Sequence, residues 1–176
     1  MEKHYKSLLK TVEVYENLLL KVSEEDFIKS PPGAAWSFSE TYAHIFQSNL
    51  LSLMAADRCI LSTGSQNFST KRIHWIAWLI LFFGRFPPIK FKAPANIGAM
   101  VKKISKEDAR NLLAKFKIRF QEVSLKIDQA DPHQKVKHPR LGLLNAVQWL
   151  RFIEVHTFHH TKQLKRIGRQ LKIEIR

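Results

Sequence analysis

The sequence predicts an all-α protein: a four-helix bundle with an extra short helix and a long loop between the second and third long helices. The seven prolines are confined to a few places and leave long stretches that a helix can occupy unbroken. In these stretches apolar residues recur at intervals of three and four, the spacing of an amphipathic helix, and no strand-like alternation competes. A chain of 176 residues, 45% of them hydrophobic, is expected to form a single domain over residues 1–176.

The first two long helices are separated by a proline–glycine break. Residues 5–22 place apolar side chains on one face and charged side chains on the other, and the Pro-Pro-Gly sequence at 31–33 then interrupts the chain. The second helix should begin after Ser37, because Ser37 and Glu40 have the spacing of a capping box. It should extend to about Leu61.

The extra short helix is expected over residues 73–83, which are strongly apolar. Its uninterrupted apolar run, Trp75 to Phe83, is far shorter than the about 20 residues that a membrane-spanning helix needs. Aromatic side chains with basic residues nearby would also suit a membrane surface, but we expect burial in the core or in a dimer interface, and no membrane partner. An irregular connection should follow over residues 87–98.

The last two long helices also have clear starts. The third should begin at Ser105, with acidic residues in its first turn, and should carry an apolar face as far as Ile127. Residues 132–142 are expected to form a loop. The fourth should begin at Asn145, which has a glutamine three residues on, and end near Gly168.

The net charge of +14 is spread over most of the chain. Residues 1–50 have a net charge of −2, whereas residues 51–100, 101–140 and 141–176 have +5, +6 and +5. This distribution describes a basic surface and not a basic tail, and it suits an anionic partner or simply a solvated surface. Because the sequence shows no helix-turn-helix, zinc-finger or aromatic nucleic-acid motif, we expect a solvated surface and no nucleic-acid partner.

Cysteine usage and the N-terminal sequence bear on the compartment. The single cysteine, Cys59, excludes an internal disulfide framework and any multi-cysteine zinc or iron–sulfur site. A lone thiol suits a reducing compartment, and the first residues lack the apolar core of a secretory signal. We therefore expect a soluble, cytoplasmic protein.

The last helix carries two histidines on its apolar face. His156 and His160 are one turn apart, so both rings leave the same side of the helix. That side is otherwise apolar and should point into the bundle, where two neutral imidazoles need either hydrogen-bond partners or a shared metal ion. His159 lies about 100° around the helix from His160 and should point away.

A third histidine, His44, lies within the second helix, where it is either a hydrogen-bonded core residue or a third ligand. Three histidines leave open positions on a metal ion, as in a catalytic site, and imidazole suits zinc, nickel, cobalt or iron. The expected interior beside the rings is apolar and is formed by Trp149, Phe152, Ile153 and Leu51.

No residue is an evident nucleophile or general base. The capping role of Glu40 explains that residue, and Glu154 should lie on another face of its helix. Cys59 lies 15 residues beyond His44 on the same helix, about 22 Å along its axis. An enzyme built on this site must therefore activate water or an exogenous thiol.

Two segments resemble the sequence motifs of the DinB-like superfamily. Residues 36–44 (WSFSETYAH) resemble its opening motif, in which a tryptophan and a cap precede the helix that bears the first metal histidine. Residues 138–144 (HPRLGLL), followed by Gln148-Trp149, Phe152 and residues 156–163 (HTFHHTKQ), look like its closing motif. The resemblance extends over about residues 36–167.

The resemblance implies an antiparallel-type bundle, a frequent homodimer and a divalent metal held by His44, His156 and His160. Zinc or nickel is expected first, with iron, cobalt and manganese as alternatives. Gln163 would orient a metal-bound water or a substrate, or would simply be a polar residue near the helix end. The family that this chain resembles includes bacillithiol- and mycothiol-dependent S-transferases and thiol-dependent isomerases. Other members have no assigned reaction and are named metal-dependent hydrolases.

We therefore expect a metal-dependent transferase or hydrolase that activates a small thiol cosubstrate, or water, toward a small-molecule substrate. The alternative is a non-catalytic binding module that meets an anionic partner through its basic surface.

Overall fold

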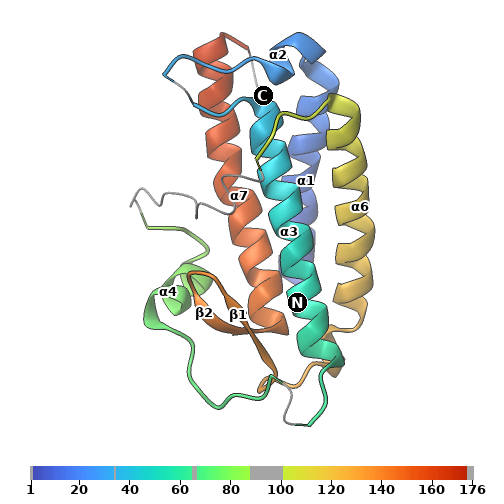
Figure 1. The fold of residues 1–176 in the computed structure, drawn as a ribbon, viewed down its shortest axis with the longest axis vertical. Helices are drawn as coiled ribbons and strands as arrows, with labels where there is room; N and C mark the ends of the chain where they lie inside the picture. The colour runs from blue at the N-terminus through green and yellow to red at the C-terminus, as the bar shows by residue number, and fades with distance from the viewer. Residues whose placement is uncertain (1, 34, 65–66, 88–100, 174–176) are drawn as a thin grey trace.

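Four long helices pack side by side in the computed structural model, which describes residues 2–33, 35–64, 67–87 and 101–173 (Figure 1). Helix α3 packs on both α7 and α6, and α1 packs on the same two helices, so the four enclose a shared core. The predicted four-helix bundle is confirmed. The long helices are α1 (Glu2–Lys21), α3 (Phe38–Leu61), α6 (Lys106–Leu125) and α7 (Ala146–Leu171).

The order of helix directions differs from the expected antiparallel arrangement. In Figure 1, α1 and α7 rise from the lower end of the bundle, whereas α3 and α6 both descend. The pairs α3–α7 and α1–α6 are therefore antiparallel, but α3–α6 and α1–α7 are parallel. Because α3 and α6 are parallel, the chain must return along the length of the bundle before α6 begins. Residues 84–105 are long enough for this: fully extended they would span about 70 Å, whereas a 20-residue helix is about 30 Å long.

Capping boxes begin three of the long helices where the sequence places them. The Ser37 side chain accepts a hydrogen bond from the Glu40 backbone N–H, and the Glu40 carboxylate accepts one from the Ser37 N–H at 2.9 Å. Ser105 before α6 and Asn145 before α7 make the same reciprocal pair of bonds. These bonds satisfy N–H groups that a helix start would otherwise leave without a partner, so the starts are determined locally.

The described residues also form short elements that the sequence did not indicate. Residues Lys135–His138 (β1) and Gly142–Asn145 (β2) pair as an antiparallel hairpin, with Val136 opposite Leu144. The expectation of a plain loop over residues 132–142 is therefore wrong. Strands of four residues are too short to show an alternating pattern, and this hairpin depends on the burial of Leu144 in the core. The other short elements are α2 (Glu24–Ile28) and the 3₁₀ turn η1 (Ile127–Gln129).

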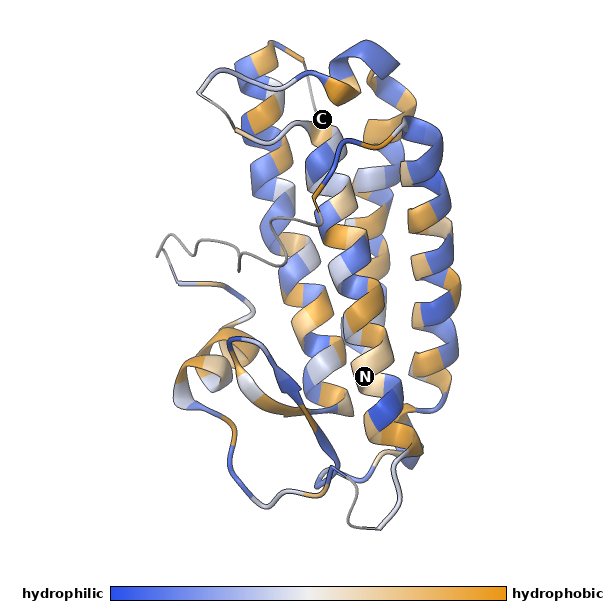
Figure 2. Cartoon of the chain, viewed as in Figure 1, coloured by the Kyte–Doolittle hydropathy of each residue, from blue (hydrophilic) through white to orange (hydrophobic). Residues whose placement is uncertain are grey.

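The apolar segment forms the expected short helix, α4 (Trp75–Phe83), beside the lower half of α7 (Figure 2). Ala77, Ile80 and Leu81 are buried, but four aromatic residues of α4 are exposed. A single helix that packs on the outside of a bundle can bury only one side, so core burial holds for that side alone. Burial of the other side in a dimer interface stays untested. No helix of the described residues is long and apolar enough to cross a bilayer. Apart from Pro87, the expected connection at 87–98 lies outside the described residues.

Two buried tyrosines join three of the long helices in the core. The Tyr15 hydroxyl on α1 donates a hydrogen bond to the Thr157 carbonyl of α7 at 2.7 Å. The Tyr42 hydroxyl on α3 donates to the Tyr15 carbonyl at 2.8 Å. Both phenols are fully buried, and burial raises the pKa of each well above its ordinary value. They therefore remain neutral donors, and they hold α3 and α7 in register beside the histidines.

Candidate metal centre

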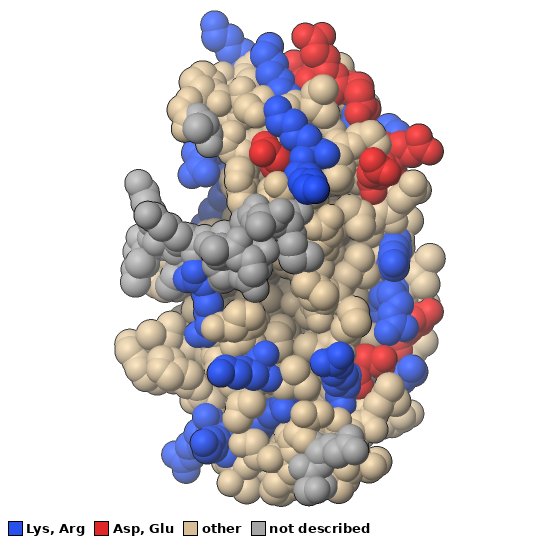
Figure 3. Space-filling model, viewed as in Figure 1, with Lys and Arg blue, Asp and Glu red and all other residues tan. Residues whose placement is uncertain are grey.

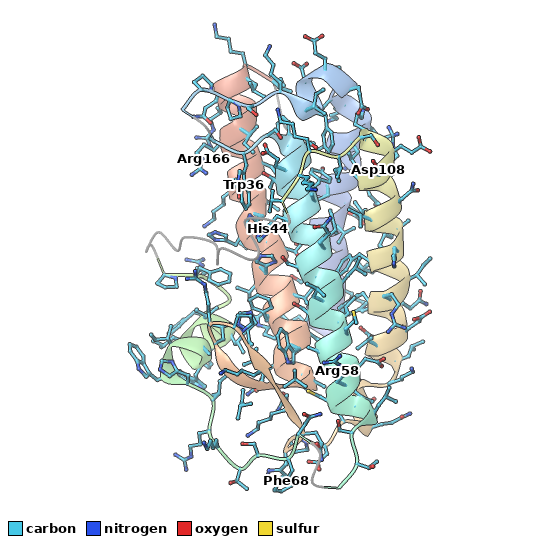
Figure 4. The ribbon with its side chains drawn as sticks, viewed as in Figure 1. Trp36, His44, Arg58, Phe68, Asp108 and Arg166 are labelled. Atoms are coloured by element: carbon cyan, nitrogen blue, oxygen red, sulfur yellow. The ribbon has the colours of Figure 1, made fainter. Side chains whose placement is uncertain are left out.

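The structure brings His44, His156 and His160 together between α3 and α7, at mid-height in the bundle (Figure 4). One nitrogen of each ring lies within 4.8 Å of the corresponding nitrogens of the other two. The Nε2 atoms of His156 and His160 are 3.1 Å apart. Both α7 rings are 8% exposed, and His44 is half-buried. Among the described residues these three form the one histidine, cysteine or carboxylate cluster with metal-ligand spacing.

The tautomer of His156 follows from its contact with Asn49, which is fully buried on α3. The Thr157 hydroxyl donates to the Ile153 carbonyl at 2.7 Å, so its oxygen is free to accept the Asn49 amide N–H at 2.8 Å. The Asn49 Oδ1 atom then faces His156 Nδ1 at 3.1 Å as an acceptor. His156 therefore carries its proton on Nδ1 and presents a lone pair at Nε2.

The same reasoning fixes the tautomer of His160. The Thr41 hydroxyl donates to the Ser37 carbonyl at 2.8 Å and accepts from the Gln163 amide Nε2 at 3.4 Å. This orientation turns Gln163 Oε1 toward His160 Nδ1, at 2.7 Å. His160 therefore also presents a lone pair at Nε2. Gln163 contacts a histidine ring through its carbonyl oxygen, and its expected part in orienting a metal-bound water or a substrate stays a prediction.

The two lone pairs face each other across 3.1 Å, an arrangement that a cation between them stabilises. Two nitrogens each about 2.1 Å from one ion are about 3.0 Å apart at a right angle and about 3.4 Å apart at the tetrahedral angle. The observed distance lies between these values. His44 Nδ1 is buried without a hydrogen-bond partner among the described residues, which is a further position that a cation would satisfy. The three side chains therefore fit a divalent metal.

All three imidazoles are held in the neutral form that a metal requires. Burial lowers the pKa of His44 to about 4 and that of His160 to about 3. Burial, followed by the neighbouring His160 and His44 rings, lowers the pKa of His156 well below 6.5. At neutral pH protons therefore do not compete for these nitrogens.

Aromatic rings line the centre on two sides. The Trp36 ring lies 5.1 Å from the His44 ring, and the Phe152 ring stacks on His156 at 5.3 Å with an interplanar angle of 17°. Trp149 and Ile153 are buried as expected, but Leu51 is 53% exposed, so its expected place in the interior is wrong. Leu51 is two turns beyond His44 on the same side of α3, so the exposed part of that side begins beyond the centre. His44 itself is half-buried.

The hairpin contributes a fourth histidine, His138, which packs beside the centre but is not one of the three clustered rings. The His138 ring lies 4.5 Å from the Phe152 ring and 5.1 Å from that of Trp149, and its Nδ1 accepts the backbone N–H of Arg140 and of Leu141. Burial and then the Arg140 charge lower the pKa of His138 to about 4. His138 thus supports the aromatic wall as a neutral ring.

The other candidate residues lie away from the ring nitrogens. The Glu40 carboxylate caps α3, and Glu154 pairs with His4 at 2.9 Å and with Arg151. Cys59 is buried near the Leu144 carbonyl, and burial raises its pKa to about 11. His159 is exposed, as its place on the helix predicted, and its ring contacts the rings of Phe86 and of the neighbouring His160. None of these four side chains offers a base or nucleophile to the centre.

Asn49, Thr41 and Thr157 are polar residues beside the histidines that the sequence reasoning missed. The sequence does show that Asn49, five residues after His44, is a polar residue on an otherwise apolar helical face. It does not show which histidine ring the Asn49 amide contacts, because that ring is on another helix.

A family model described as the DinB superfamily matches residues 7–164. The chain belongs to this superfamily. The match includes the three histidines, Asn49 and Gln163, and it confirms the resemblance drawn from the two motifs. No curated protein matches the chain significantly.

Two solved structures share the fold of this DinB-superfamily chain. TT2238, described as a four-helix bundle protein, is 17% identical with a TM-score of 0.58, and the match covers 93% of this chain and 96% of TT2238. YfiT from Bacillus subtilis, described as a probable metal-dependent hydrolase with an unusual four-helix bundle topology, is 11% identical with a TM-score of 0.58. That match covers 98% of this chain and 88% of YfiT. At these identities the likeness shows the fold alone.

Proposed function

We propose that this protein is a metal-dependent enzyme in which a divalent ion held by His44, His156 and His160 activates a small thiol toward an electrophilic small molecule. The observation that carries the proposal is the pair of Nε2 lone pairs, 3.1 Å apart, with both Nδ1 protons engaged by amide oxygens. Zinc and nickel are the ions that we expect first, followed by iron, cobalt and manganese.

Asn49 and Gln163 keep the two α7 imidazoles in one tautomer and one orientation, so their nitrogens are preorganised as ligands. A divalent ion on three neutral imidazoles supplies a Lewis acid with open positions, which makes a small acidic nucleophile more acidic. Trp36 and Phe152 border the rings and exclude water from part of the approach, so they favour an electrophile with an apolar body.

The absence of a nearby carboxylate base among the described residues favours a thiol over water as the nucleophile. Glu40 and Glu154 are engaged elsewhere, so no carboxylate takes up a proton at the centre. A thiol has an ordinary pKa of about 8.5 and loses its proton to the solvent when it binds a cation, whereas water needs a far larger shift. The basic balance of the chain would attract a thiol that carries carboxylates.

In the proposed step the thiolate sulfur forms a bond to an electrophilic carbon of the acceptor, and the leaving group departs with the bonding electron pair. The thiol proton passes to the solvent. Hydrolysis is the second candidate function, and it is favoured by the description of YfiT, which has the same fold, as a probable metal-dependent hydrolase.

The test is a screen of the metal-loaded protein with several low-molecular-weight thiols and a dinitrophenyl halide, with thioether formation followed by absorbance. We expect turnover that falls to the uncatalysed rate in His44→Ala. His133→Ala is the matched control, because His133 is exposed, lies outside the three-histidine cluster and should leave the rate unchanged. Equal rates for wild type and His44→Ala would refute the metal mechanism. Release of product from an ester without any thiol would establish the hydrolase instead.

A further inference from the structure

Helix α4 presents an exposed ridge of aromatic side chains, which we call the aromatic ridge: Trp75, Trp78, Phe82 and Phe83. Their exposed fractions run from 49% to 66%, and the Trp78 and Phe82 rings stack at 4.9 Å. All nine residues of α4 are apolar. A folded protein rarely leaves contiguous large apolar side chains in water without a partner for them, so the ridge marks a contact surface.

The exposure of these four side chains reverses our sequence-based expectation of no membrane partner. We propose that α4 is a membrane-docking element, which places the aromatic ridge in the headgroup region of an anionic lipid bilayer. A nine-residue helix is about 14 Å long, so it is suited to lie in the plane of the interface and not to cross the membrane. Tryptophan in particular favours the boundary between headgroups and acyl chains.

The charges around the aromatic ridge match such a surface. The sequence from 58 to 87 contains four Lys and Arg residues and no Asp or Glu. Lys71, Arg72 and Arg85 flank α4 on both sides in sequence and are exposed. The hairpin adds Lys137, which is exposed, and Lys135, whose ammonium donates to the Lys71 carbonyl and so joins the hairpin to the segment before α4.

The space-filling view agrees with this distribution. In Figure 3 basic side chains lie around the lower left of the molecule, where α4 and the hairpin are in Figure 1, and no acidic side chain is visible among them. At the upper end and along the right edge basic and acidic side chains are mixed. Each basic residue close to an anionic membrane contributes about 1 kcal/mol to binding, a fivefold change in affinity.

The same charges argue against a second copy of the chain as the occupant. Two copies meeting through α4 would bring two sets of basic residues to one interface, and like charges across an interface oppose association. An anionic bilayer offers negative headgroups and an apolar interior in one surface, which is the combination that the aromatic ridge and its flanking residues present.

Helix α4 is attached firmly enough to carry a membrane contact. The Arg151 guanidinium on α7 donates through Nε to the Leu81 carbonyl at 2.9 Å and packs over Gly84, which ends α4 in the left-handed region at φ 64°. A Cβ on residue 84 would lie 2.7 Å from Arg151 Nη2 and would displace the tip of that guanidinium, and the positive φ itself favours glycine. The apolar surface continues past Phe82 into a cavity of about 590 Å³ that Leu125 and Val147 also line.

The experiment is flotation of the full-length protein with vesicles of phosphatidylcholine alone or enriched in phosphatidylglycerol, at an ionic strength of about 0.15 M. We expect binding to the anionic vesicles only, weakening as salt is raised. Replacing all four aromatic-ridge residues by serine should abolish it, and Lys71→Gln with Arg72→Gln should weaken it about 25-fold. Because these side chains are exposed, the variants should remain folded, which circular dichroism would verify.

Matched controls separate the aromatic ridge from general surface hydrophobicity and charge. Serine at the exposed residues Leu20, Met54, Leu61 and Ile118 should leave vesicle binding unchanged, as should Arg110→Gln with Lys115→Gln on α6. Three outcomes would overturn the proposal: no binding to anionic vesicles, a dimer that the aromatic-ridge variant dissociates in place of vesicle binding, or binding to nucleic acid in place of vesicles. Binding should be equal with and without metal, so this test is independent of the proposed enzyme activity.

Discussion

Asn49 offers the sharpest test of the metal centre, because it touches a histidine without being a ligand. In Asn49→Ala the His156 Nδ1–H loses its acceptor, whereas Thr157 keeps its bond to the Ile153 carbonyl. A buried donor left without a partner costs about 1–3 kcal/mol. That range agrees with the loss of about 10–100-fold in metal affinity that follows removal of a partner hydrogen-bonded to a ligand. We therefore expect zinc to bind about 10–100-fold more weakly.

The measurement is a competition titration of zinc between the protein and a chromophoric chelator at neutral pH. Asn49→Asp keeps an oxygen at the acceptor position and should bind zinc at least as tightly as wild type. Ser52→Ala, also buried on α3, loses only a bond to the Ser48 carbonyl and controls for damage to the helix. If folded Asn49→Ala bound zinc with wild-type affinity, the tautomer argument for His156 would be wrong.

Four further outcomes are expected. Elemental analysis of the tag-free protein should find about one divalent ion per chain and essentially none after His156→Ala and His160→Ala are combined; retained metal would place the site elsewhere. Glu40→Ala should lower the free energy of unfolding, measured by urea denaturation, by about 1 kcal/mol, because the Ser37 N–H loses its capping partner. Metal affinity should be unchanged. A change in metal affinity instead would assign Glu40 to the centre. The metal-free protein should lose stability as pH falls from 6.5 toward 4, because the buried histidines take up protons only when the protein unfolds. The free energy of unfolding should fall by up to about 1.4 kcal/mol per pH unit for each buried histidine. Urea titrations that show no such slope would contradict the lowered pKa values of His44 and His160. Cys59 should react with an aromatic disulfide reagent only after unfolding, since the thiol is buried with a pKa of about 11; rapid labelling of the folded protein would contradict that burial.

The sequence alone determined the features that depend on neighbours along the chain. The capping pairs begun by Ser37, Ser105 and Asn145 place three helix starts, because a cap bonds only to residues within one turn. His156 and His160 share one face because helical geometry places residues four apart side by side. The two family motifs are likewise contiguous in sequence, and the family match confirms the membership that they implied.

Only the tertiary structure decided which side chains meet across helices. The bond from Asn49 to His156 exists because α3 packs on α7, and neither residue's own helix contains information about that approach. The same packing leaves Leu51 outside the centre, although it lies on the same side of α3 as His44. The sequence of α4 is apolar on every side, so it does not indicate which side of the helix is buried. The buried side is the one that packs against the bundle. The spacing of residues along a helix determines the direction in which each side chain points. The environment of that side chain depends on the element that packs opposite it.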